Sequence, residues 1–230
     1  MTKAVQFHYF FDPLCGWCYA SAPALAALDG AYPGAVQMMP SGLFADGNAR
    51  AVSSMADHAW RNDMRISKLA GQRFTEAYRE NVLLNPRGVF DSGPATRALV
   101  ALGELSATLE PVFLHQVQLA RYIEARDTSL PDEVAAVAIA VAREANFLLK
   151  STDFALRLTE DEELAARANE RIAETRKLMG RLSSSGVPQL LVSRDGQAEV
   201  IHGAPLYSGE DEVLRAVSDV TSRLTAASGE

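Results

Sequence analysis

The sequence predicts an α/β protein in which one small sheet is interrupted by a large all-helical insertion. Three observations lead to this fold class. The start of the chain alternates between strand and helix patterns, the end returns to strands before a last helix, and the long segment between them shows helical patterns without a convincing strand. The expected order is βαβ, a helical block, and ββα.

The N-terminal βαβ unit begins with a strand predicted at 5–11, where polar and apolar residues alternate. Asp12-Pro13-Leu14 ends this strand, and one helix is expected to run from there to the turn at Tyr32-Pro33-Gly34. A second short strand is predicted at 36–39. Strands joined through a helix are expected to lie parallel, with a right-handed crossover.

The helical block is predicted between about residues 51 and 180. One of its helices has Pro131 in its first turn, where a missing N–H costs nothing. A second helix is expected to begin with a capping box formed by Thr159 and Glu162. The first of these helices carries a buried stripe with i, i+3, i+4, i+7 spacing: Val134, Val137, Ala138, Val141, Ala142 and Ala145.

Strand patterns return at 189–193 and 198–202, and the Asp195-Gly196 turn between them predicts a hairpin. Ser208 is expected to cap the last helix, whose buried stripe is Val213, Val217, Val220 and Leu224. The sequence therefore predicts a discontinuous sheet domain and an inserted helical domain. Their expected extents are 1–45 with 181–230, and 46–180.

The two cysteines, Cys15 and Cys18, are three residues apart at the start of the first predicted helix. A disulfide between such close neighbours stabilises a fold little, which leaves redox chemistry or metal binding. Unpaired N–H groups and the dipole at a helix start favour the thiolate of the first cysteine, and the second sulfur lies one turn away. We therefore expect Cys15 to be the attacking nucleophile and Cys18 the more buried, resolving thiol.

Zinc sites use the same cysteine spacing but need two further ligands. No two histidines of the chain are paired at a metal-binding spacing; they are His8, His58, His115 and His202. The pattern favours a redox pair, and no metal ion is predicted.

Composition and charge argue against other classes of function. The net charge is −7, and no basic stripe offers a contact surface for a phosphate backbone, so a nucleic-acid partner is not expected. No apolar stretch approaches the roughly 20 residues that a membrane span needs. The first residues read as part of a strand and not as an export signal, so a cytoplasmic location is expected.

Three pieces of the chain resemble the DsbA-like branch of the thioredoxin superfamily, and in particular its cytoplasmic FrnE-like protein-disulfide isomerases. They are Phe10-Phe11-Asp12-Pro13, Cys15-Gly16-Trp17-Cys18 and Gly186-Val187-Pro188-Gln189. The resemblance covers nearly the whole chain, including the helical insertion. It implies a thioredoxin-like fold and a thiol–disulfide oxidoreductase or isomerase. The partners would be protein or small-molecule thiols and disulfides, and the redox-active disulfide would serve without another cofactor.

The resemblance also implies roles for site residues. In the family, the proline before the returning strand is cis and packs against the active-site disulfide. The implied catalytic residues are Cys15, Cys18 and Pro188. The residues expected to bind substrate are Pro13, Gly16, Trp17 and Val187, the last through its backbone.

Trp17 separates this chain from strongly oxidising relatives, and its two cysteines separate it from a sister branch of the family. Trp17 stands where strongly oxidising relatives carry a histidine, and it supplies no positive charge, so a weaker oxidant is predicted. A sister branch, the kappa-class glutathione transferases and 2-hydroxychromene-2-carboxylate isomerases, usually has serine in place of Cys15 and lacks the second cysteine. Glutathione-dependent transferase or isomerase chemistry is the alternative function, and glutathione is a candidate co-substrate.

Overall fold

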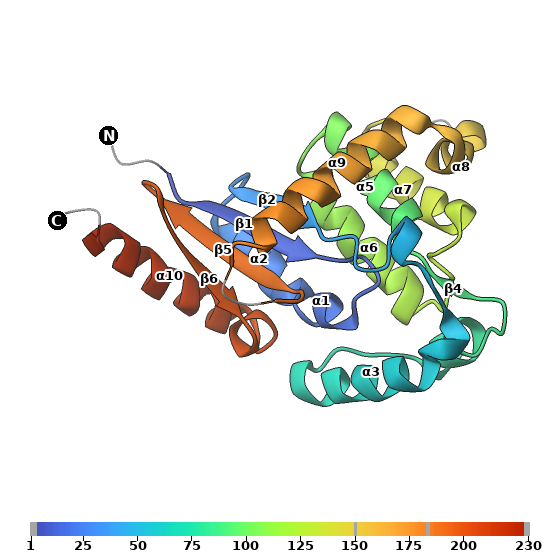
Figure 1. Ribbon diagram of the computed structural model, residues 1–230, viewed down its shortest axis with the longest axis horizontal. Helices are drawn as coiled ribbons and strands as arrows, with labels where there is room; N and C mark the ends of the chain where they lie inside the picture. The colour runs from blue at the N-terminus through green and yellow to red at the C-terminus, as the bar shows by residue number, and fades with distance from the viewer. Residues whose placement is uncertain (1–3, 150, 183–184, 228–230) are drawn as a thin grey trace.

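A four-stranded mixed sheet with the order β2-β1-β5-β6 organises the fold (Figure 1). The computed structural model describes residues 4–149, 151–182 and 185–227. β1 is parallel to β2, and β5 forms a hairpin with β6, as the sequence predicted. β1 also pairs with β5, and this pairing is antiparallel. The strands are β1 (Gln6–Phe11), β2 (Val36–Pro40), β5 (Gln189–Arg194) and β6 (Gln197–His202).

Helices from the middle of the chain lie beside the sheet, and α9 runs from this block onto the sheet (Figure 1). They are α3 (Ala56–Ala70), α4 (Glu76–Tyr78), α5 (Gly93–Leu105), α6 (Leu109–Tyr122), α7 (Pro131–Glu144), α8 (Ser151–Glu160) and α9 (Glu162–Met179). The expectation of no strand in this region is wrong in one detail. Two-residue strands β3 (Arg50–Ala51) and β4 (Val89–Phe90) pair with each other, a ladder too short to leave a periodic pattern.

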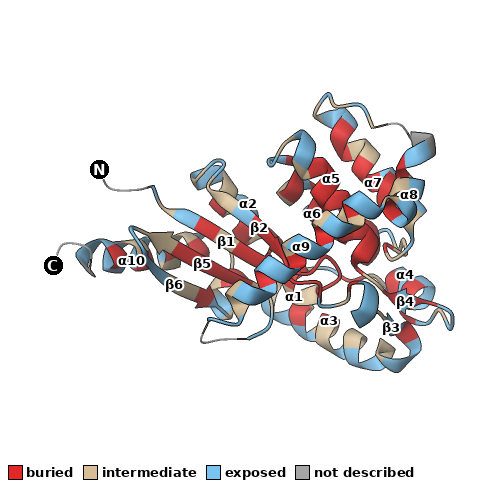
Figure 2. Ribbon diagram, turned by 45° about the horizontal axis from the view of Figure 1, so that its top comes forward, coloured by how far each residue is buried: buried red, intermediate tan, exposed pale blue. Residues whose placement is uncertain are grey.

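Both faces of the sheet are covered, and Phe7, Tyr9 and Phe11 share one face, as the alternation in β1 predicted. Phe7, Tyr9 and Phe11 belong to the large core that includes side chains of α2 (Ala22–Ala31) and α10 (Glu210–Ala227). Phe10 points to the opposite face, where it packs with Met39 and Leu191 beneath the end of α9. Figure 2 shows the resulting run of buried residues along the strands.

The sheet layer and the helical block share a core. The same cluster of buried apolar side chains contains Phe7 and Leu28 from the sheet layer and Leu99, Phe113 and Val141 from α5, α6 and α7. The division into two domains at 46 and 180 stays a prediction.

The first helix is broken, although one helix was expected. α1 (Gly16–Ala20) ends before Ser21, and α2 starts at Ala22. Pro23 explains the break, because a proline lacks the N–H that would continue the helix and its ring clashes with the carbonyl of Tyr19 four residues earlier. The Ser21 hydroxyl donates to the carbonyl of Cys18 at 3.0 Å and satisfies an acceptor near the break.

Two predicted helix caps are wrong. Asp161, and not Thr159, caps α9, and its carboxylate accepts from the backbone N–H of Leu164 at 3.0 Å. Thr159 lies within the last turn of α8, where its hydroxyl donates to a backbone carbonyl. An acidic residue two positions closer to the helix is the better placed acceptor for the first free N–H groups.

The second wrong cap is Ser208, because the last helix begins later than that cap implied. α10 starts at Glu210, and the carbonyl of Gly209 accepts from the N–H of Val213 at 3.5 Å. Gly209 has φ +109°, a conformation that favours glycine and turns the chain into the helix.

Arg171 of α9 ties the helical block to the sheet. Its Nη1 donates to Oε1 of Glu110 on α6 at 2.7 Å, and its Nη2 reaches both the other carboxylate oxygen and the carbonyl of Met38 in β2. The side chain of Glu110 is only 7% exposed, and that of Arg171 is 22% exposed. A paired, hydrogen-bonded charge is stable in such a place, whereas an unpaired one is costly.

We expect Arg171→Met to lower the free energy of unfolding by about 2–3 kcal/mol, because it leaves the Glu110 carboxylate buried and unpaired. Urea denaturation measures this change. Arg167→Met is the matched control on the same helix. Its ion pair with Glu104 is exposed at both side chains, so the loss should stay within about 1 kcal/mol. Equal losses in the two variants would contradict the assignment.

Candidate redox site

Cys15 occupies the N-cap of α1, as predicted from the sequence. Its carbonyl accepts from the N–H groups of Cys18 and Tyr19 at 3.0 and 3.1 Å, and its own N–H donates to the carbonyl of Asp12 at 3.1 Å. Both cysteines are free thiols. Cys15 is 8% exposed and Cys18 is 1% exposed, so the first thiol is the more accessible.

The far end of the chain meets this helix at Val187. The Cys15 thiol lies 3.8 Å from the carbonyl oxygen of Val187, although 172 residues separate them in sequence. The Val187–Pro188 peptide bond is cis, as the resemblance implied. The sheet explains the contact, because Phe10 near the end of β1 pairs with Gln189 at the start of β5.

Cys18 lies behind Cys15 in the core. Burial, above all, and the neighbouring Cys15 thiol hold the pKa of Cys18 well above its ordinary value. The Asp12 carboxylate acts in the same direction, while a hydrogen bond with the backbone of Asp12 opposes it. Cys18 is therefore held as the neutral thiol while Cys15 is the sulfur nearer to solvent.

A groove of about 270 Å³ opens beside the Val187–Pro188 segment. The ring of Trp17 forms one wall, with Tyr207 at 5.1 Å and the Arg65 guanidinium at 5.7 Å from it. Of the residues expected to bind substrate, the groove brings together Trp17 and Val187. Pro13 lies buried in the turn before Cys15, and Gly16 faces α3, so neither lines this groove. The principal lining residues are Trp17, Arg65, Val187, Pro188, His202 and Tyr207.

Asp12 fixes the turn that presents Cys15. Its fully buried carboxylate accepts from Leu14 N–H at 3.0 Å, from Phe44 N–H at 3.2 Å and from the Ser92 hydroxyl at 2.9 Å. Burial raises the pKa of Asp12, and these hydrogen bonds oppose the rise. From the sequence, Asp12 was identified as a strand breaker and as part of the Phe10-Phe11-Asp12-Pro13 piece that resembles the family, and no role was predicted for its carboxylate.

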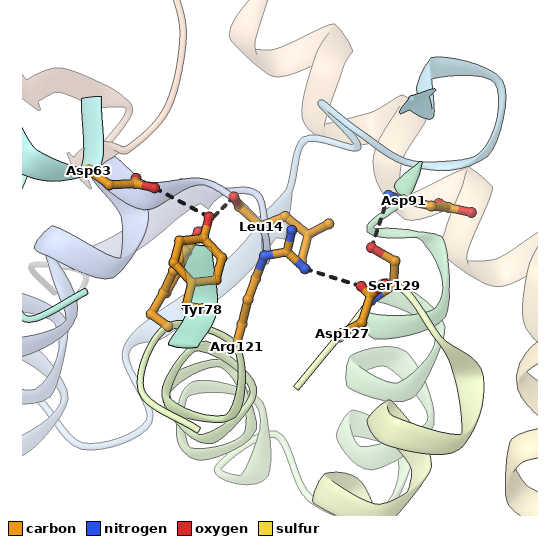
Figure 3. Close-up of polar contacts among 8 residues, drawn as sticks. Leu14, Asp63, Tyr78, Asp91, Arg121, Asp127 and Ser129 are labelled. Atoms are coloured by element: carbon orange, nitrogen blue, oxygen red, sulfur yellow. Dashed lines mark hydrogen bonds and ion pairs between the residues drawn. The ribbon is translucent and has the colours of Figure 1, made fainter. Parts of the chain in front are cut away.

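A second buried acid, Asp63 of α3, lies directly against α1, the helix that begins with Cys15 at its N-cap. A Cβ added at Gly16 would stand 2.7 Å from Oδ1 of Asp63, closer than side-chain atoms tolerate. Tyr78 donates its hydroxyl to Asp63 at 3.3 Å (Figure 3). Burial raises the pKa of Asp63 to about 7, although the Tyr78 hydrogen bond and the charge of Arg121 oppose the rise.

Arg121 (Figure 3) and Tyr122 complete the support beneath the site. The Arg121 side chain is fully buried, with its guanidinium 5.0 Å from the Phe90 ring and 3.5 Å from Asp127. The Tyr122 hydroxyl donates to the carbonyl of Leu14 at 2.8 Å, next to Cys15. Sequence reasoning missed Asp63, Arg121 and Arg65, because no local pattern distinguishes them from other charged helix residues.

The described ranges are 4–149, 151–182 and 185–227. No group of three or more histidine, cysteine, aspartate or glutamate side chains there could hold a metal ion. No helix there is both long and apolar enough to cross a bilayer.

The raised pKa of Asp63 predicts a pH-dependent stability. Between the ordinary value of 3.8 and about 7, the folded protein keeps a proton on Asp63 that the unfolded chain has released. Stability is therefore lost as the pH rises through this window, with a slope from this group of at most about 1.4 kcal/mol per pH unit. We expect Asp63→Asn to remove this slope in urea denaturation between pH 5 and 8.

Asp57→Asn, an exposed position on the same helix, is the control and should follow the parent protein at every pH. Asp12 contributes equally to all three proteins, so it does not affect their differences. Parallel stability curves for the parent and Asp63→Asn would show that Asp63 titrates normally.

Comparison with solved structures identifies the family. The chain is 30% identical to the cytosolic disulfide reductase DsbM from Pseudomonas aeruginosa, with a TM-score of 0.77 over 95% of this chain and 99% of that one. The structure of the same reductase with GSH matches at 29% identity and a TM-score of 0.74, over 95% of this chain and 100% of that chain. A Nitrosomonas europaea protein described provisionally as a protein disulfide isomerase shares the fold at 21% identity, with a TM-score of 0.71 over 96% of this chain and 98% of that one.

No protein-family model and no curated protein sequence matches the chain. The structural match nevertheless extends over nearly the full length of both chains at 30% identity, and it includes the sheet and the inserted helices. The chain therefore belongs to the DsbA-like thiol–disulfide oxidoreductases of the thioredoxin superfamily.

Proposed function

We propose that Cys15 and Cys18 are the redox pair of this oxidoreductase and that the chain acts as a disulfide reductase. The observation that supports this most directly is the position of the Cys15 thiol, at the N-cap of α1 and 3.8 Å from the carbonyl of Val187. An extended substrate segment beside Val187 would place its own sulfur next to Cys15. The deeper position of Cys18 suits the resolving thiol.

In the proposed reaction the Cys15 thiolate attacks one sulfur of a substrate disulfide. The substrate S–S bond breaks, a mixed disulfide forms on Cys15, and the departing thiolate takes a proton. Cys18 then loses its proton and attacks the Cys15 sulfur, which releases the second substrate thiol. The substrate has gained two electrons, and the enzyme is left with a Cys15–Cys18 disulfide.

Glutathione is the proposed reductant of that disulfide. Two glutathione molecules would restore the two thiols and leave as glutathione disulfide, which balances the two electrons. The GSH complex of the related reductase supports this choice, and the Arg65 guanidinium beside Trp17 offers this chain a site for a carboxylate. We propose a cytosolic location on the same relationship.

Variants of the two cysteines test the assignment. We expect Cys15→Ser to abolish glutathione-driven reduction of insulin, because no attacking thiolate remains. Cys18→Ala should accumulate a mixed disulfide between Cys15 and substrate, because no neighbouring thiol resolves it; intact-protein mass spectrometry detects that adduct. Full activity of Cys15→Ser would refute the proposed nucleophile.

The Cys18→Ala variant also distinguishes the proposed reductase from the alternative, a glutathione transferase or isomerase. A glutathione transferase or isomerase would need Cys15 alone, so Cys18→Ala would keep nearly full turnover. A reductase needs both thiols, and its Cys18→Ala variant would lose most turnover while still forming the adduct.

A further inference from the structure

Helix α3 packs against α1 and buries few of its own residues. Of its residues only Asp63 and Ile66 are buried, and Figure 2 shows the helix mainly in the colours of exposed and intermediate residues. Asp63 and Ile66 are three residues apart and so share the inner side of the helix. The outer side is open to a partner.

The outer side of α3 is basic and apolar. Arg61, Arg65 and Lys68 follow one another at i, i+4 and i+7, and all three are exposed. None of the three has an ion pair or a side-chain hydrogen bond within the described ranges. We call the basic face of α3 the six residues that border a hollow of about 470 Å³: Trp60, Arg61, Met64, Arg65, Lys68 and Leu69.

This concentration of cations stands out against the charge of the whole chain, which is −7. The apolar part is also unusual for a free surface, since Leu69 is 52% exposed beside Trp60 and Met64. At the edge of this surface the Arg79 guanidinium stands over the Trp60 ring at 5.2 Å, and its charge is paired with Glu76 at 3.6 Å. The surface thus combines attraction for carboxylates with a place for an apolar side chain.

The basic face is continuous with the groove beside the Val187–Pro188 segment. Arg65 lines both, and its guanidinium lies 5.7 Å from the centre of the Trp17 ring. A chain segment that leaves the groove past Trp17 therefore passes onto α3. From Arg61 to Lys68 the helix rises about 10 Å, which an extended polypeptide covers with about three residues.

We propose that the basic face of α3 binds an acidic stretch of polypeptide next to the cysteine of a protein substrate. This inference rests on the proposed function and names its preferred substrate class. Arg61 and Lys68 meet the carboxylates, and an apolar substrate side chain fills the hollow against Trp60 and Leu69. A small disulfide held in the groove reaches Arg65 but neither of these outer cations.

The test compares two synthetic peptides that carry the same internal disulfide, flanked either by glutamates or by lysines, with bis(2-hydroxyethyl) disulfide as the small substrate. In low salt we expect the kcat/KM of the parent protein for the acidic peptide to exceed that for the basic peptide about tenfold. The preference should shrink in 0.5 M sodium chloride, because salt screens exposed charges. Arg61→Glu/Lys68→Glu should abolish or reverse it and leave the small substrate unaffected.

Arg87→Glu/Arg143→Glu is the matched control, because it changes the net charge equally at two exposed positions outside α3. A parent protein that treats both peptides alike, or a control that loses the preference as fully as the α3 variant, would overturn the proposal. Fluorescence anisotropy with a labelled acidic peptide lacking cysteine measures binding alone. If the parent protein binds this peptide and the α3 variant does not, the proposal is supported. This holds even if the parent protein reduces no disulfide, a result that would refute the proposed function alone. If the parent protein does not bind the peptide, the proposal is refuted.

Discussion

The antiparallel pairing of β1 with β5 is the constraint on which the site depends. It sets Phe10 opposite Gln189, so the residues that follow one strand lie beside those that precede the other. This register brings Cys15 and Val187 together, although 172 residues separate them in sequence. A slip of one residue in the pairing would turn the side chains of β1 to the wrong faces and separate the thiol from the cis-proline segment.

The site also rests on buried polar groups that the protein has to hold without water. Asp12 receives three hydrogen bonds and fixes the turn before the first cysteine, which accounts for its place in the interior. Asp63 is less well satisfied, with one long hydrogen bond from Tyr78. Neutralising a poorly solvated carboxyl is cheaper than burying its charge, which is why the pKa of Asp63 rises to about 7.

Much of the fold followed from the sequence because its signals are local. The alternation of β1, the Asp195-Gly196 hairpin and the stripe of α7 each depend on neighbouring residues, and all three were predicted. The break at Ser21 could also have been foreseen from Pro23. The caps at Asp161 and Gly209 were missed because several polar residues compete within one turn, and their ranking depends on where the preceding element stops.

The site was predicted in part for the same reason. The cysteine pair and the Val187–Pro188 bond could be found through the motif and the family resemblance. Arg65 and Asp63 could not be found from the sequence, because they lie on opposite sides of α3. Only the packing of α3 on α1 decides that Arg65 faces the groove and Asp63 faces Gly16.

The contact between Asp63 and Gly16 restricts which substitutions this enzyme tolerates between its two cysteines. The two residues between the cysteines are not equivalent in the room that they leave for a substitution. Trp17 borders an open groove, so many replacements fit there. Any replacement of Gly16 carries a β-carbon into the carboxyl of Asp63. Evolution and protein engineering therefore have one adjustable position in this motif, unless α3 changes with it.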